Sequence, residues 1–299
     1  MVALVATLLL GFALRVVELD HRPLWWDEGN NAFFAHQSLF GLVRESRATQ
    51  DTDPPVHRLL LGLWKELVGS SPFSMRMLSA LAGVVTIPLT WAVGRWLMGK
   101  QVALLAQLLV ALAPMQVYYG REAKGYTLAA ALALLCTYTW GRKLGYVDPG
   151  LELPSDASPW WIVYVLSSAM GLGTHYYLAP LFLWQGLWTA GSLGVAAIGR
   201  TSDWTAAHRA LGRWLLAAGM IALLLAPWVA FQFVSTARGV RGLSDANSST
   251  VPIYLQKMGL AMSAGPDQTG PHALLATFVL LVLGIVGALT TSRGVFLAA

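Results

Sequence analysis

The chain has 299 residues, of which 56% are hydrophobic and only 12% are charged. A soluble domain carries about 25% charged residues, so this composition argues against a water-soluble globule. The net charge of +5 comes from basic residues scattered between apolar runs, which argues against nucleic-acid binding and favours contact with a membrane or a lipid phosphate. Thirteen tryptophans and nine tyrosines agree with a membrane protein, because such rings concentrate at bilayer interfaces.

Apolar runs of nearly the length that crosses a bilayer, roughly 17–25 residues, recur along the chain. They predict an all-α polytopic membrane protein that forms a single transmembrane domain over residues 1–299. We expect about eight spanning helices, at 1–18, 75–98, 101–119, 125–141, 159–174, 176–198, 212–234 and 272–291.

A polar stretch from 20 to 73 follows the first predicted span. Within it, "NNAFFAHQSLFGLV" and "VHRLLLGLWKELVG" carry apolar residues at helical spacing, but they are too short or too charged to span easily. We expect both to be amphipathic helices at the membrane interface. The second motif also fits a poor membrane helix.

Basic residues in short loops predict the orientation, because cytoplasmic loops are enriched in Lys and Arg. They fall in alternate connections, which places these loops and the N-terminus in the cytoplasm. The connections at 20–73, 118–125, 174–177 and 235–270 then face outside. The basic residues concerned are Arg95, Lys100, Arg142, Lys143, Arg200, Arg209, Arg213 and Arg293.

The candidate reactive residues all lie in these outer connections. The first are Asp27 and Glu28 in "PLWWDEGNNAF", directly after Trp25 and Trp26. One interpretation is a solvated pair at the start of a helix, where carboxylates are favoured. The other is a general base, because apolar surroundings raise the proton affinity of a carboxylate.

The second candidate is "DTDPPVH", in which two prolines hold the preceding backbone extended before a helix begins. This motif fits a simple turn from loop to helix. It also fits a ligand set in which Asp51 or Asp53 binds a divalent cation such as Mg²⁺, with His57 one turn into the helix. No tight ligand spacing establishes a metal.

The third candidate is "YYGREAKGY". It fits interface anchoring with a local salt bridge. Alternatively, Arg121 and Lys124 clamp a phosphate, Arg as a fork and Lys as a point charge, while Glu122 orients one of them or helps to hold a metal. His175 in "THYY" is a weaker candidate, because a belt of interfacial aromatic residues explains its neighbours Tyr176 and Tyr177.

These motifs resemble the polytopic transferases that use lipid-linked sugars. An aromatic lead into Asp-Glu, a later Asp-x-Asp-Pro-Pro, and Arg-Glu-Ala-Lys-x-Tyr, ending at Tyr126, occur in the order of glycosyltransferase family 39. This family includes protein O-mannosyltransferases and aminoarabinose-transferase-like enzymes and has the GT-C fold. The resemblance covers residues 25 to 126, and beyond Tyr177 it is mostly one of hydropathy.

The resemblance implies a membrane enzyme that moves a hexose or pentose from a polyprenyl-phosphate donor to a hydroxyl of a lipid, glycan or protein. It implies an active site on the outer face of the cell membrane. Asp27 would be the base with Glu28 beside it, while Arg121, Glu122 and Lys124 would shape the donor site. The residues themselves, apart from the resemblance, leave Asp53 and Glu122 as the candidate ligands of any divalent cation, Mg²⁺ or Mn²⁺. Lys124 departs from the commoner Arg, which removes a bidentate fork.

Other functions remain open from the sequence. Family members usually have more spans and often a soluble C-terminal domain, so we expect a truncated or shortened relative, and an inactive fragment is one alternative. A transporter or flippase for polyprenyl lipids is another. Transporters usually hold their ionisable groups near the middle of the membrane, whereas the acids here fall at the outer ends of the predicted spans.

Overall fold

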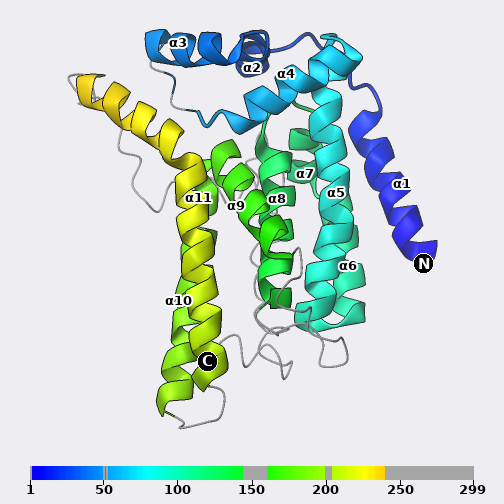
Figure 1. The fold of residues 1–299 in the computed structure, drawn as a ribbon. Coiled ribbons are helices and arrows are strands. Elements are labelled where there is room, and N and C mark those ends of the chain that lie inside the picture. Colours follow the sequence, from blue (N-terminus) through cyan, green and yellow to red (C-terminus); the bar gives the residue numbers. More distant parts are fainter. Residues whose placement is uncertain (1, 50, 52, 144–159, 199–203, 240–299) are drawn as a thin grey trace, which may run out of the picture. The chain divides into compact units, whose positions relative to one another are not determined.

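The computed structural model describes residues 2–49, 51, 53–143, 160–198 and 204–239, and every regular element in these ranges is helical (Figure 1). This confirms the predicted all-α class. In chain order the elements are α1 (Val2–Val16), α2 (Trp26–Ala35), α3 (Leu39–Thr49), α4 (Val56–Val68), α5 (Pro72–Met98), α6 (Lys100–Leu112), α7 (Pro114–Gly120), α8 (Tyr126–Lys143), α9 (Trp160–Thr174), the 3-10 helix η1 (Tyr176–Leu178), α10 (Ala179–Ile198) and α11 (Trp204–Gly239).

The chain folds as two compact units. The first comprises the described residues within 1–32 and 64–127. The second comprises Phe33–Leu63 and Leu128–Arg238. Each unit is built from segments that are distant in sequence, and α4 contributes residues to both.

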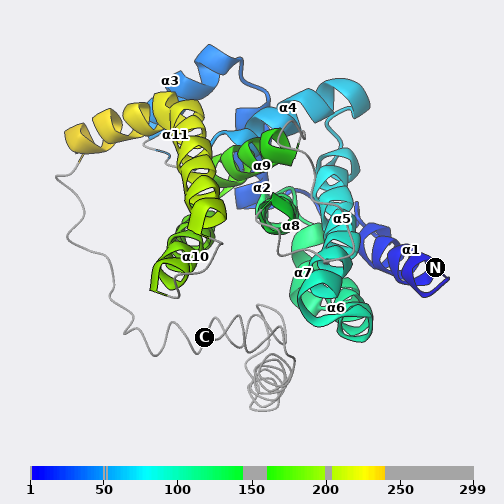
Figure 2. The same cartoon turned by 60° about the horizontal axis from the view of Figure 1, so that its bottom comes forward.

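In the first unit, α5 packs against α6, α1 and α7, and Figures 1 and 2 show these helices side by side. The start of α5 is well specified, because the Ser71 side chain accepts a hydrogen bond from the Ser74 backbone N–H and Pro72 occupies the first helical turn. Met75 and Ile87 of this helix are fully buried. The helix therefore provides a rigid wall for the residues of the first loop.

A proline divides α6 from α7. The two helices meet at a 53° bend around the single residue Ala113, with Pro114 opening α7. Pro suits the first turn of a helix because its missing N–H would have no helical partner there. The short α7 ends at Gly120, directly before the "REAK" segment, so its direction determines where that segment lies.

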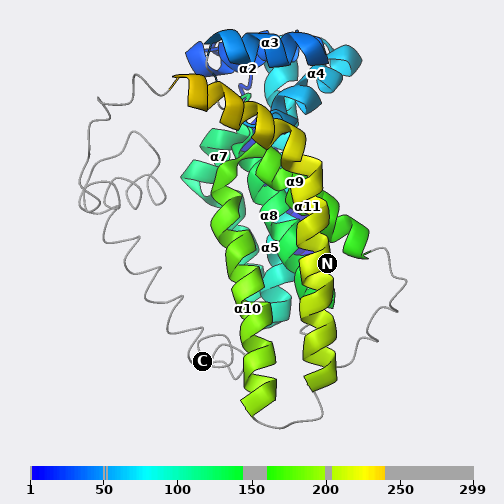
Figure 3. The ribbon, with the colours of Figure 1, turned by 60° about the vertical axis from the view of Figure 1, so that its left-hand side comes forward.

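In the second unit, α10 and α11 run side by side (Figure 3). A Cβ added at Gly186 of α10 would lie 2.4 Å from the Trp214 ring of α11, so the absence of a side chain permits this approach. Buried polar groups are paired here: Tyr164 Oη donates to Gln185 Oε1 at 2.9 Å and accepts from Trp214 Nε1 at 3.1 Å. The packing explains why polar residues occur within these apolar helices.

Two described helices, Pro72–Met98 and His208–Gln232, are long and apolar enough to cross a membrane, and the bent α6–α7 pair is a third if it counts as one span. The apolar helices Ala3–Val16 and Trp160–Thr174 are shorter. The predicted span at 272–291 lies outside the described residues. The number eight therefore stays a prediction, as does the interfacial location of the loop helices α2, α3 and α4.

Candidate functional site

The adjacent acids Asp27 and Glu28 lie in the first turn of α2, where the helix dipole favours carboxylates. Their surroundings differ completely. The side chain of Glu28 is fully buried, whereas that of Asp27 is 43% exposed. One acid is therefore part of the interior of the first unit, while the other is accessible to a ligand.

Glu28 forms a bidentate ion pair with Arg76 of α5. Its Oε1 accepts from Arg76 Nε at 2.8 Å, and its Oε2 accepts from Arg76 Nη2 at 2.6 Å. The carboxylate also accepts from the backbone N–H of Ala123 at 2.8 Å and of Trp25 at 3.3 Å. Such charge-assisted pairs are both strong and directional. Glu28 thereby connects the start of α2 to α5 and to the segment after α7.

Arg76 was not among the predicted site residues. Its Nη1 donates to the carbonyls of Leu19 and Arg22, and its Nη2 donates to that of Pro23. The connection between α1 and α2 is therefore held around the guanidinium. The sequence did carry a signal for Arg76: it is a charged residue near the start of an apolar run, and a charge in such a position needs a partner.

Asp27 contacts the third motif directly. Its Oδ2 lies 3.0 Å from Lys124 Nζ, and the lysine side chain is mostly buried. The backbone of this motif is fixed, because Asn31 Nδ2 donates to the Ala123 carbonyl and Ser79 Oγ donates to that of Lys124, both at 2.9 Å. Two motifs that the sequence placed in separate loops are thus adjacent.

Glu122 is buried next to the same group. Burial raises the pKa of its carboxyl above the ordinary value, and the nearby negative charges of Glu28 and Asp27 raise it further. A hydrogen bond from the Tyr118 side chain and the positive charge of Lys124 act in the opposite direction. Glu122 therefore holds its proton more tightly than an ordinary glutamate does.

Arg121 follows the last residue of α7 and reaches back to α1. Its Nη2 donates to the carbonyl of Val17 at 2.8 Å and to that of Glu18 at 3.3 Å. These carbonyls directly follow the last residue of α1, Val16, and a cation is favourable at a helix C-terminus. The guanidinium remains partly exposed, so it can also meet a ligand.

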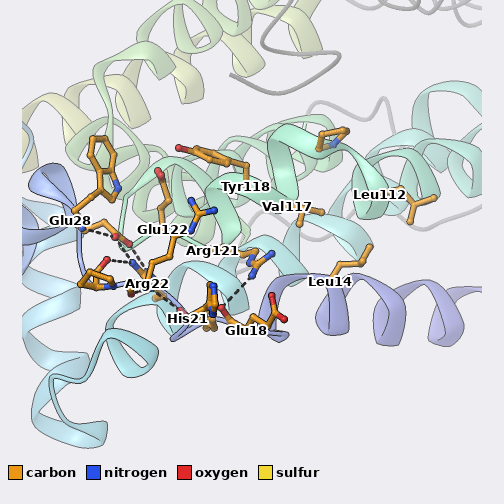
Figure 4. A pocket seen from close by; sticks show the side chains of 15 residues that line it. Leu14, Glu18, His21, Arg22, Glu28, Leu112, Val117, Tyr118, Arg121 and Glu122 are labelled. Carbon is orange, nitrogen blue, oxygen red and sulfur yellow. Dashed lines mark hydrogen bonds and ion pairs between the residues drawn. The ribbon is translucent and has the colours of Figure 1, made fainter. Parts of the chain in front are cut away.

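A cavity of about 710 Å³ lies beside these residues in the first unit. Figure 4 shows charged side chains, among them Glu28, Glu122 and Arg22, toward one end and apolar side chains at the other. The apolar end is formed by Leu14 of α1, Leu112 of α6 and Val117 of α7. The cavity is therefore amphipathic, which suits a ligand with a charged head and an apolar tail.

The residues of "DTDPPVH" belong to the second unit. Asp51 accepts two hydrogen bonds from Arg58, to Oδ1 and Oδ2 at 2.9 Å each, and Asp53 Oδ2 lies 3.1 Å from Arg58 Nη2. The guanidinium is buried and also lies 4.0 Å from the centre of the Phe34 ring. His57 is buried and is the second residue of α4, within its first turn. Arg58, which sequence reasoning did not single out, organises this group.

The remaining candidates have local aromatic contacts. His175 caps η1, accepting from the Tyr177 N–H at 3.4 Å, and its ring lies 4.5 Å from that of Tyr177. In the first unit, the Tyr126 ring lies 4.5 Å from that of Tyr119. None of these contacts identifies a reactive group.

The described residues do not by themselves establish a site for a divalent cation. Within these ranges no group of three or more His, Cys, Asp or Glu side chains is placed to hold one. Arg58 already supplies positive charge to Asp51 and Asp53. A metal requirement therefore stays a prediction, and no step below is routed through a metal.

Comparison with known proteins places the chain in a family. Residues 52–231, more than half of the chain, match the family described as dolichyl-phosphate-mannose-protein mannosyltransferase. The match includes Asp53 and Arg121 to Lys124, whereas Asp27 and Glu28 precede it. No curated protein gives a significant match.

Two solved structures of an oligosaccharyltransferase from Archaeoglobus fulgidus resemble the chain weakly. One is the archaeal enzyme AglB with an inhibitory peptide and a dolichol-phosphate, at 13% identity and a TM-score of 0.49, covering 98% of this chain and 37% of the other. The second is tethered to an acceptor peptide, at 13% identity and a TM-score of 0.47, covering 97% and 39%. This chain thus spans little more than a third of their length, and TM-scores below 0.5 carry no argument about function.

The family match confirms the resemblance seen in the sequence. This chain belongs to the dolichyl-phosphate-mannose-protein mannosyltransferase family, a glycosyltransferase family of membrane proteins.

Proposed function

We propose that this protein transfers a sugar from a polyprenyl-phosphate donor to an acceptor hydroxyl, with Asp27 as the general base. Family membership supports the class of reaction. The observation that carries the assignment of the site is the contact of Asp27 with Lys124. Glu28 and Glu122, one and two residues away from them in the chain, line an amphipathic cavity in the same unit, where a donor lipid has room to bind.

The chemistry needs one base and one cationic group. A polyprenyl phosphate is a good leaving group, so no strong general acid is required, unlike in glycoside hydrolysis, where two carboxylates share the work. Asp27 takes the proton of the acceptor hydroxyl while its oxygen attacks the anomeric carbon, and the bond from that carbon to the phosphate oxygen breaks with inversion. Lys124 stabilises the negative charge that develops on the phosphate.

The cavity provides the proposed donor site. Arg22 and Arg121 line its charged end, where they can bind the phosphate. Leu14, Leu112 and Val117 line the other end, where the first isoprene groups of the tail can lie. We place this site at the outer face of the cell membrane, with a lipid, glycan or protein hydroxyl as acceptor.

Glu28 has a supporting role in this proposal. Both of its oxygens are occupied by Arg76 and by backbone N–H groups, and it is fully buried. It therefore positions Asp27 and the "REAK" segment, and its oxygens are engaged by the protein although the residue borders the cavity.

The decisive experiment uses membranes that contain the protein and a panel of radiolabelled polyprenyl-phosphate sugars. Wild-type protein should transfer label from at least one donor, and Asp27→Asn should abolish transfer at unchanged expression. Asp20→Asn, an exposed acid in the same loop, is the matched control and should retain activity. Full turnover by Asp27→Asn would remove Asp27 as the base.

The donor site has a test of its own. Arg121→Ala should raise the donor KM more than it lowers kcat, because its guanidinium lines the cavity. An unchanged donor KM would contradict a phosphate-binding role for Arg121.

A further inference from the structure

Arg15 is a fully buried cation in the apolar helix α1. Within the described ranges it forms no ion pair with a carboxylate; its guanidinium instead donates to backbone carbonyls. We propose that Arg15 is a positioning residue that caps the broken end of α6 and so fixes the direction in which α7 carries Arg121–Lys124 toward Asp27. The catalytic meaning of this inference rests on the proposed function, but the capping itself does not.

The carbonyls that Arg15 contacts are those left without helical donors by the break. In a helix the carbonyl of Val110 would accept from the N–H of residue 114, but Pro114 has no N–H. Arg15 Nη2 donates to that carbonyl at 3.2 Å, and Nη1 donates to the next one, of Ala111, at 3.1 Å. The preceding carbonyl, of Leu109, is already satisfied by Ala113 at 2.7 Å. The arginine thus supplies donors where the proline removed one.

The neighbouring helices leave room for this side chain. A Cβ added at Gly83 of α5 would lie 2.8 Å from Arg15 Nε, and one added at Gly120 would lie 3.0 Å from its Cγ. Gly120 is the last residue of α7 and directly precedes Arg121. The Arg15 side chain therefore passes against the very end of the helix whose direction it sets.

A second contact joins the segment after α7 back to the end of α1. Arg121, which follows α7, donates to the carbonyls of Val17 and Glu18 at the end of α1. One arginine thus connects α1 to the end of α6, and the other connects the end of α7 to the end of α1. Two such contacts oppose rotation of α7 about its break more effectively than one.

The guanidinium is specifically suited to this role. It offers five N–H donors in a planar fork, so it can donate to two carbonyls of α6 and also, at 2.9 Å, to the Gly11 carbonyl of its own helix, α1. A lysine ammonium is a compact point charge that does not reproduce this fork. Arg15→Lys should therefore retain only part of the effect.

Hydrogen exchange of the full-length protein in nanodiscs tests the capping without any assay of activity. Arg15→Met, which keeps length and loses all donors, should speed amide exchange in Met115–Gly120 by about tenfold or more, because buried carbonyls lose their donors. Thr7→Val is the matched control, since its hydroxyl bonds only to Ala3 of the same helix at 2.7 Å. Unchanged exchange of α7 in Arg15→Met would overturn the proposal.

Pro114→Ala separates capping from a general loss of packing. It returns an N–H to position 114, which gives the Val110 carbonyl a backbone donor. In this background Arg15→Met should speed exchange in α7 clearly less than in the wild-type chain. An equal effect in both backgrounds would show that Arg15 does not act through the broken end of α6. If Arg15→Met does not fold alone, comparing Arg15→Lys in both backgrounds decides the same question.

The rate of sugar transfer provides a third test of the role of Arg15. Arg15→Met should lower kcat for sugar transfer by up to about 100-fold, because small displacements of reacting groups are costly, and change donor KM much less. Normal kcat together with faster α7 exchange would contradict the positioning role. If wild-type protein transfers sugar from no donor, the proposed function fails while the exchange result still decides the capping.

Discussion

Replacing Glu28 with Gln should separate the roles of the two adjacent acids. The substitution preserves shape but removes the negative charge that faces Arg76, whose side chain is 6% exposed, and it turns an amide NH₂ toward groups that are themselves donors. Removing one partner of a buried pair costs about 3–5 kcal/mol. At about 1.4 kcal/mol per tenfold, the ratio of folded to unfolded protein should fall by more than about 100-fold.

Thermal unfolding of the purified protein in detergent measures this effect. At about 2 °C per kcal/mol for a large domain, Glu28→Gln should lower Tm by about 6–10 °C. Asp27→Asn is the natural control, because its partly exposed pair with Lys124 is worth only about 0–1 kcal/mol. That variant should unfold within about 2 °C of wild type and yet lose sugar transfer. A Tm for Glu28→Gln equal to that of wild type would refute the reasoning, as would a large loss in Asp27→Asn.

Three further predictions follow from the same contacts. Arg58→Met leaves two aspartates without their cation and should lower the free energy of unfolding by about 3 kcal/mol, as urea unfolding would show; no loss would contradict its organising role. In wild type, a rise in pH from below 4.5 through the raised pKa of Glu122 forces a buried carboxyl to ionise, which lowers the stability of the folded protein. Glu122→Gln has no such carboxyl, so its stability relative to wild type should increase over the same pH range. Tm measured against pH for both proteins checks the sign. Gly120→Ala crowds Arg15 and should cost about 1–3 kcal/mol, whereas an unchanged Tm would mean that the side chain moves aside freely.

Much of the architecture could be predicted from composition and periodicity. The all-α class follows from long apolar runs, and α5 begins near the predicted residue because Ser71 and Pro72 mark a helix start. The break at Pro114 was missed within the expected span 101–119, although a proline inside an apolar run is its visible signal. Local sequence signals therefore predict where helices begin and end better than they predict which helices span a membrane without a break.

The partners of the site residues could not be predicted in this way. The sequence indicated that Asp27 and Lys124 face the same side, but their contact depends on how α5 packs. The two arginines that organise the first unit, Arg15 and Arg76, lie within or beside apolar runs, where hydropathy treats them only as interruptions. Apart from the Gly11 carbonyl, which is four residues from Arg15, their carbonyl and carboxylate partners lie 48 to 96 residues away in sequence, so no local pattern could identify them.

The split between Asp27 and Glu28 has a simple geometric origin. Consecutive residues of a helix point about 100° apart around its axis, so two adjacent acids in the first turn of α2 cannot share one environment. When Glu28 turns inward to Arg76, Asp27 must turn toward a different side, where it meets Lys124. The buried pair thereby fixes the rotation of α2, and this rotation sets the direction of the exposed carboxylate. An Asp-Glu pair at a helix start can thus combine an anchor with a reactive group, and exchanging the two residue types by Asp27→Glu and Glu28→Asp should impair both.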